Sequence, residues 1–168
     1  MSAYEITAFR EHLDQQDPEN KEIRRTFHEN YEWLEGYWRS SWKNNGFQNF
    51  CNKFGKYFWE HIAELPELAR EFGWLGPIGD SCLEGYEPNP KVKDATKLLQ
   101  ENGGNSVERF KATMLLVRQV RNNLFHGQKM ELLELDVYNR NKNLIRFAGN
   151  ITGLLLDHLL QAEEFLGS

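Results

Sequence analysis

The sequence predicts an all-α protein, an up-and-down and mostly antiparallel bundle of four to five main helices in a single domain over residues 1–168. Three observations favour this fold class. Apolar residues recur every three or four positions along most of the chain, which is the spacing of one helix face. The alternating pattern of a half-buried strand is nearly absent. A length of 168 residues fits one domain with a sizeable core.

Two helices are expected before the first clear break in the pattern. A short helix over residues 3–15 should end at Asp17-Pro18, because the residue before a proline disfavours helical backbone. The next should run over residues 19–40 and stop at Asn44-Asn45-Gly46, a strong turn signal. Its apolar face consists of Ile23, Phe27, Tyr31, Leu34 and Trp38.

A third helix is predicted over residues 47–65, with Pro66 either near its end or at the start of a further short turn. An irregular segment over residues 73–90 follows, with four glycines and three prolines. Such a long connection in a compact bundle is often functional. Its role is left open among a lid, a substrate contact and a packing flap.

Three more helices are predicted in the second half. A short helix over residues 90–101 precedes a long one from Ser106, taken as its N-cap, to His126, where Gly127 suits a left-handed C-terminal cap. The last helix should cover residues 136–165. Its apolar face is expected to consist of Leu144, Phe147, Ile151, Leu154, Leu155, His158, Leu159 and Ala162.

Composition limits the classes of protein that fit. The formal net charge of −5 argues against a broad basic surface for nucleic acid, although a local basic groove remains compatible with it. No segment approaches the roughly 18 apolar residues of a membrane span, and the N-terminus is too polar for a signal peptide. Cys51 and Cys82 form no metal-binding spacing. A cytoplasmic protein with two reduced thiols and no metal or other cofactor is therefore expected.

The helix from Ser106 contains an arginine where its apolar repeat asks for an apolar residue. The repeat runs Val107, Phe110, Met114, Val117, Arg121, Leu124. Burying a guanidinium without a partner is costly. Either Arg121 pairs with a carboxylate, with Glu131, Glu134 and Asp136 nearest in sequence, or this end of the bundle opens into a groove or a subunit interface.

Arg118, Asn122 and His126 follow one another in steps of four and should share a second face of the same helix. His126 lies in the last turn, where the negative helix end favours protonation. Histidine transfers protons near neutral pH and arginine binds phosphate through two hydrogen bonds. These residues, without a neighbouring serine or cysteine nucleophile, favour phosphate chemistry such as metal-free RNA cleavage.

The run V-R-N-N-L-F-H-G resembles the signature of the HEPN superfamily (higher eukaryotes and prokaryotes nucleotide-binding domains). In that signature an arginine and a polar residue precede a histidine at the end of a long bundle helix. Arg121, Asn122 and His126 would be these residues, with Arg118 as an auxiliary phosphate contact. The close match covers about ten residues; the all-α layout and domain length agree with it more loosely.

The resemblance implies a metal-independent endoribonuclease in a toxin–antitoxin, phage-defence or RNA-processing system. It also implies a homodimer in which two motifs form one cleft, so that Arg121 would face a groove between subunits. The implied partners are RNA and an antitoxin such as a nucleotidyltransferase-like protein. The alternatives are a non-catalytic nucleotide-binding or protein-interaction module of the same fold, and a plain helical scaffold.

Several other residues admit both a functional and a structural interpretation. His61 and His158 lie on apolar helix faces, which is more typical of a satisfied core histidine than of a catalytic one. Aromatic stripes usually indicate a core or an interface rather than a base-stacking platform. These stripes are Trp33/Tyr37 and Tyr57/Phe58/Trp59. The lysine cluster at Lys91, Lys93 and Lys97 is more typical of a solvated helix face than of an RNA contact.

Overall fold

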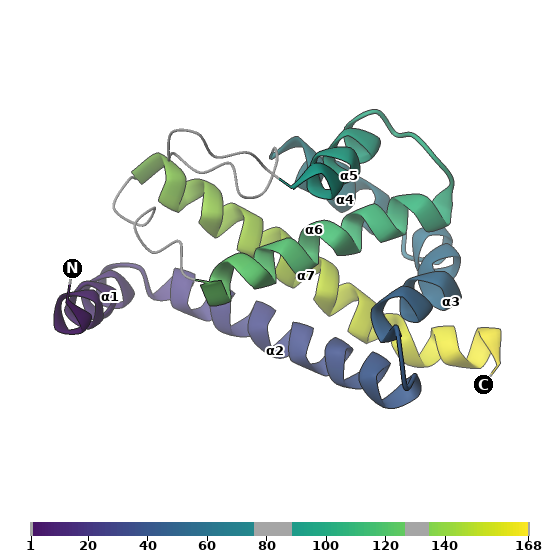
Figure 1. Cartoon of the computed structure of the whole chain (residues 1–168), viewed down its shortest axis with the longest axis horizontal. Helices are drawn as coiled ribbons and strands as arrows, with labels where there is room; N and C mark the ends of the chain where they lie inside the picture. The colour runs from purple at the N-terminus through teal and green to yellow at the C-terminus, as the bar shows by residue number, and fades with distance from the viewer. Residues whose placement is uncertain (1, 76–88, 127–134, 168) are drawn as a thin grey trace.

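Seven helices and no strand are found in the described part of the computed structural model, which comprises residues 2–75, 89–126 and 135–167 (Figure 1). Within those ranges, the side chains of residue 13, of 123–126 and of 135–138 are not described. The all-α prediction is confirmed. The helices are α1 (Ala3–Gln16), α2 (Pro18–Ser41), α3 (Gly46–His61), α4 (Leu65–Trp74), α5 (Pro90–Gln100), α6 (Ser106–His126) and α7 (Leu135–Leu166).

The two longest helices, α2 and α7, lie side by side and run parallel. Near their N-terminal ends, Lys142 Nζ lies 2.9 Å from the Asp17 carboxylate. Further along, Asn30 Nδ2 donates to the Gly149 carbonyl at 3.2 Å, and the Tyr37 hydroxyl bonds Glu163. Residue numbers rise together along both helices, so the mostly antiparallel arrangement expected from sequence does not hold for this pair.

Helices α3 and α6 pack antiparallel against each other and complete the core. Gly55 of α3 faces Phe110 of α6 so closely that an added Cβ would lie 3.0 Å from a ring carbon of Phe110. A glycine at this position lets the two helices approach. Phe50 lies at the centre, with its ring 5.4 to 6.3 Å from those of Tyr37, Trp38, Phe54, Phe58 and Phe110.

The turn between α2 and α3 is the one that the sequence indicated. Asn45 adopts a left-handed backbone, with φ of 57°, a conformation that asparagine tolerates better than most residues. At Gly46 an added Cβ would lie 2.6 Å from the Trp38 carbonyl oxygen, so only glycine fits. The turn folds α3 back onto the aromatic face of α2.

The described structure corrects two predicted boundaries. The helix predicted over residues 47–65 ends at His61, and Pro66 lies in the first turn of a separate helix, α4. The N-cap of α6 is Asn105 rather than Ser106, because the Asn105 side chain accepts a 2.9 Å hydrogen bond from the Glu108 amide. Most of the irregular segment, residues 76–88, and the cap expected at Gly127 lie outside the described residues.

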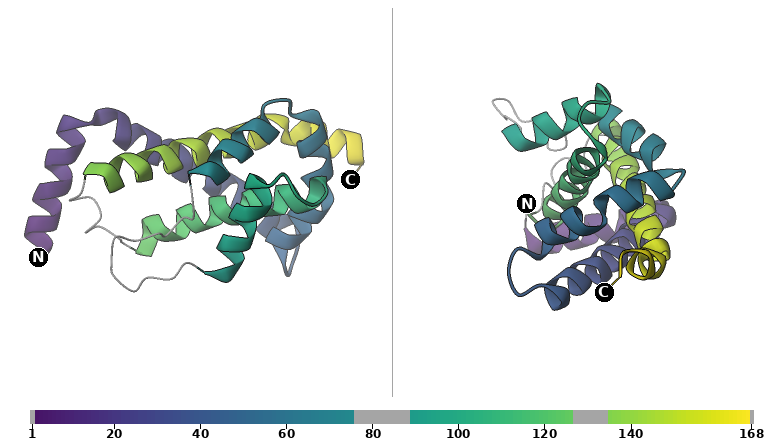
Figure 2. Two further views of the ribbon diagram at one scale, coloured as in Figure 1. Left: turned by 90° about the horizontal axis from the view of Figure 1, so that it is seen from above. Right: turned by 90° about the vertical axis from the view of Figure 1, so that its right-hand side faces the viewer.

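Helix α1 lies at one end of the bundle (Figure 2, left). Charged side chains connect it to α2. Arg24 pairs with Asp14 at 2.6 Å, and Lys142 reaches Asp17 at the junction with α2. Tyr4 near its start is 83% exposed. No helix in the described ranges is both long enough and apolar enough to span a membrane.

Candidate functional site

Arg121 lies on the face of α6 that meets α2, and it has a carboxylate partner there. Its Nη2 atom is 3.6 Å from Oε1 of Glu35, and its guanidinium carbon lies 5.3 Å from the centre of the Tyr31 ring. The Arg121 side chain is 32% exposed and that of Glu35 is 20% exposed. The apolar slot is therefore filled by a half-buried cation paired across the helix interface, with one edge open to solvent.

The Arg121–Glu35 pair is long for a charge-assisted hydrogen bond, whose usual length is about 2.7–2.9 Å. The same oxygen of Glu35 lies 3.7 Å from Nη2 of Arg39, one turn along α2. One carboxylate oxygen thus faces two guanidinium groups and holds neither tightly. Displacing the Glu35 carboxylate from Arg121 would therefore break no short contact between these two groups.

Tyr31 forms the buried base of this charged cluster. It is 3% exposed, and the pKa of its hydroxyl is raised to about 12, chiefly by burial and then by the negative charge of Glu35. Arg121, Arg118 and Arg39 oppose this rise. Tyr31 therefore stays protonated at neutral pH and serves as a neutral ring beneath Arg121, not as a base.

Asn122 and Arg118 lie next to Arg121 on α6. The Asn122 side-chain oxygen accepts a 3.5 Å contact from Nη1 of Arg121. Arg118 is exposed, and its guanidinium carbon lies 5.0 Å from the centre of the Phe47 ring at the start of α3. Each of these two arginines thus makes a cation–π contact with another helix: Arg118 with Phe47 of α3, and Arg121 with Tyr31 of α2.

His126 is the last residue of α6, as the sequence predicted, but its side chain lies outside the described part of the structure. Glu131 and Glu134 also lie outside the described residues, and the side chain of Asp136 is not described. The structure thus brings Arg118, Arg121 and Asn122 together and adds Glu35 and Tyr31 from α2. Whether the His126 ring joins them stays a prediction.

Comparisons with protein-family models, curated proteins and solved structures found no match.

His61 and His158, the other two histidines on predicted apolar faces, lie on α3 and α7, outside this cluster. His61 is exposed rather than in the core; its ring stacks on Tyr57 at 4.2 Å and its Nδ1 is 3.0 Å from the Tyr57 carbonyl oxygen. His158 is half-buried, with Nδ1 2.9 Å from the Leu154 carbonyl oxygen. Trp33 is 72% exposed, whereas Phe58 is fully buried. Lys91, Lys93 and Lys97 are exposed on α5.

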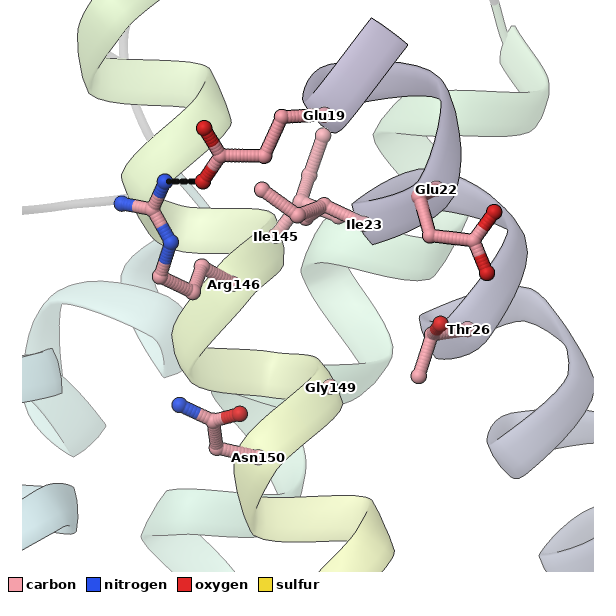
Figure 3. A pocket seen from close by; sticks show the side chains of 8 residues that line it. All are labelled: Glu19, Glu22, Ile23, Thr26, Ile145, Arg146, Gly149 and Asn150. Atoms are coloured by element: carbon pink, nitrogen blue, oxygen red, sulfur yellow. Dashed lines mark hydrogen bonds and ion pairs between the residues drawn. The ribbon is translucent and has the colours of Figure 1, made fainter.

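A pocket of about 240 Å³ opens between α2 and α7 (Figure 3). Ile23 and Ile145 line it together with Thr26 and Gly149, and the Glu19 carboxylate points toward Arg146 at 2.7 Å. The Arg146 hydrogen bond lowers the pKa of the Glu19 carboxyl, with Lys142 contributing. The pocket contains none of the predicted site residues.

Among the described side chains, no group of three histidine, cysteine or acidic residues could hold a metal ion.

Proposed function

We propose that the chain is a metal-independent endoribonuclease of the HEPN type, with a HEPN-like bundle and Arg121, Asn122 and His126 as its site. The observation that supports it best is the position of Arg121. It occupies an apolar slot of α6, yet its side chain stays one-third exposed, and its pair with Glu35 is long, at 3.6 Å. An arginine with an exposed edge is accessible to a phosphate, to which it can donate two hydrogen bonds.

The proposed reaction is attack of a ribose 2′-oxygen on the adjacent phosphorus. His126 transfers a proton, either from the 2′-hydroxyl or to the departing 5′-oxygen, and Arg121 stabilises the charge that builds on the phosphate oxygens. The bond from phosphorus to the 5′-oxygen breaks, which leaves a 2′,3′-cyclic phosphate and a free 5′-hydroxyl. Asn122 orients Arg121, with which it is in contact, and Arg118 binds a further phosphate.

A homodimer of cytoplasmic chains, with two motifs in one cleft, remains part of the proposal, as does an antitoxin such as a nucleotidyltransferase-like protein. The resemblance in the motif supports these partners. The exposed edge of Arg121 is compatible with a second copy lying close to it.

The test is cleavage of a defined single-stranded RNA by the purified protein in EDTA. We expect fragments ending in a 2′,3′-cyclic phosphate, and no cut at a position whose ribose carries 2′-deoxy in place of the hydroxyl. Cleavage that persists at a 2′-deoxy position would contradict attack by the 2′-oxygen. Absence of any cleavage over a range of RNAs would contradict the proposed activity.

A second candidate function is a non-catalytic nucleotide-binding or protein-interaction module with the same fold. The contacts that Arg121 already makes with Glu35 and Tyr31 favour it, because they give the arginine a structural use. This candidate predicts nucleotide or protein binding without cleavage, and no growth arrest on expression. Growth arrest that depends on His126 would count against it.

Glu35→Gln is expected to strengthen RNA binding, seen as a KM lower by up to about fivefold, while kcat does not rise. The carboxylate competes with phosphate for Arg121, and a partly exposed ion pair contributes up to about 1 kcal/mol. The measurement is steady-state cleavage with KM and kcat resolved.

Glu29→Gln is the matched control for Glu35→Gln, because Glu29 is an exposed carboxylate on α2 that pairs with Arg25 at 3.8 Å. This control should leave both constants unchanged. A Glu35→Gln protein with an unchanged KM would show that the carboxylate does not compete at the site.

A further inference from the structure

Helix α6 is cationic in an otherwise acidic chain. It holds four basic side chains, Arg109, Lys111, Arg118 and Arg121, against one acidic side chain, Glu108, which gives a net charge of +3. The whole chain carries −5, so the remainder carries −8. The positive charge is thus concentrated on the helix that carries the candidate site.

Only some of these cations are used to hold the fold together. Arg109 donates hydrogen bonds to the carbonyls of Asn102, Gly103 and Gly104, at 2.9 to 3.2 Å, and so fixes the connection before α6. Lys111 and Arg118, by contrast, make no ion pair with any of the described residues. Among the described residues, Arg118 contacts the Phe47 ring, and no carboxylate pairs with either cation.

Lys111 and Arg118 lie on the same face of α6, next to α3. Seven residues separate them, close to two helical turns and a rise of about 10 Å. Both act on the buried thiol of Cys51 in α3: burial raises the pKa of Cys51 to about 12, and Lys111 and Arg118 oppose that shift. Phe47, one turn before Cys51, supports the Arg118 guanidinium. The two cations thus border the α3–α6 junction.

We propose that Lys111 and Arg118 bind backbone phosphates of a single-stranded RNA whose reacting phosphate lies at Arg121. This inference rests on the function proposed above for Arg121 and adds the path of the substrate. The strand would follow α6 from its C-terminal end toward Lys111, along the side that faces α3.

The distribution of charge favours a single strand over a duplex. A flexible strand can place successive phosphates along one narrow row of cations. A duplex is rigid and would bring its second strand beyond this row of cations, and the rest of the chain, with a net charge of −8, repels phosphates on average.

The test is binding of the full-length protein to a fluorescently labelled strand of 2′-O-methyl RNA, which lacks the reactive hydroxyl and so is not consumed. Affinity is measured by anisotropy from 0.05 to 1 M salt. Lys111→Gln and Arg118→Gln are each expected to reduce the slope of log affinity against log salt by about 0.7, the share of one single-strand phosphate contact. If each variant binds like the wild type at 1 M salt, a slope smaller by about 0.7 makes its Kd about fivefold higher than the wild-type Kd at 0.1 M salt.

Lys91→Gln and Lys97→Gln are matched controls, because they remove the same charge from exposed positions on α5. They should leave the slope and the Kd at their wild-type values. Thermal melting of all four variants checks that the fold is retained.

Three outcomes would overturn the proposal: wild-type slopes for both α6 variants, an equal loss in the α5 controls, or a duplex of the same sequence that binds as tightly. A polyglutamate peptide that binds as tightly as RNA would assign the surface to an acidic protein instead. Cleavage of unmodified RNA by the wild type separates the two proposals. If the wild type cleaves RNA but Lys111→Gln and Arg118→Gln keep the wild-type salt slope, only the proposed path of the strand is refuted. If both variants lower the slope but the wild type does not cleave RNA, only the ribonuclease function is refuted.

Discussion

RNA cleavage is expected to fall by about 10²- to 10⁴-fold when His126 is replaced with alanine, the range that a positioned acid or base contributes. Arg121→Ala should cause a comparable loss, because Arg121 is the residue proposed to donate two hydrogen bonds to the reacting phosphate. Arg121→Lys should recover only part of the rate, since lysine keeps the charge but not the planar pair of donors. Initial rates on a defined strand in EDTA measure all three effects.

His158→Ala and His61→Ala are the matched controls, because both histidines lie on other helices and bond main-chain carbonyls of their own helix. They should cleave at the wild-type rate. Melting temperatures show whether a variant loses activity because it unfolds. Arg121→Ala should keep a near-wild-type melting temperature, because Glu35 retains its second partner, Arg39. Equal cleavage by the wild type, His126→Ala and Arg121→Ala would refute the assigned site.

Phe50→Ala should lower the free energy of unfolding by about 3–5 kcal/mol, the usual cost of truncating a buried phenylalanine. Its ring is fully buried and contacts aromatic rings from α2, α3 and α6. The cavity would therefore open where three helices meet, and relaxation of any one of them would disturb the other two. Urea denaturation followed by circular dichroism measures the loss.

Trp33→Ala is the control for Phe50→Ala, because it removes a larger aromatic side chain that is 72% exposed. An exposed substitution of this kind should change the unfolding free energy by less than about 0.5 kcal/mol. Equal losses for the two variants would contradict the described position of the core.

The helices and most of their bounds were predictable because helical periodicity is a local property of the sequence. The break between α3 and α4 was not, because Phe58, Ile62 and Leu65 continue the spacing of three or four across it and all three are buried. The N-cap of α6 was misplaced by one residue because Asn105 and Ser106 are both good capping residues. The choice between them depends on backbone geometry.

The candidate site was predictable only in part, for the same reason. The apolar repeat identifies Arg121 as a cation in an apolar slot, but sequence proximity suggests only the acidic residues that follow it as partners. The described partner, Glu35, comes from α2 and precedes it by 86 positions. Nothing in the local pattern of α2 distinguishes Glu35 from the exposed glutamates around it. Only the packing of α2 against α6 selects it.

The parallel packing of α2 against α7 also constrains how the chain reaches its native state. Asn30 meets Gly149 across 119 residues of sequence. Helix α3 can cover the C-terminal part of the α2 face early, but Phe27 lacks its native neighbour Gly149 until α7 has been synthesised. At about 5–20 residues per second, that interval is on the order of 6 to 24 s on the ribosome. The nascent chain therefore exposes Phe27, which is fully buried in the finished protein, for many seconds. Chaperone capture during synthesis is the expected consequence.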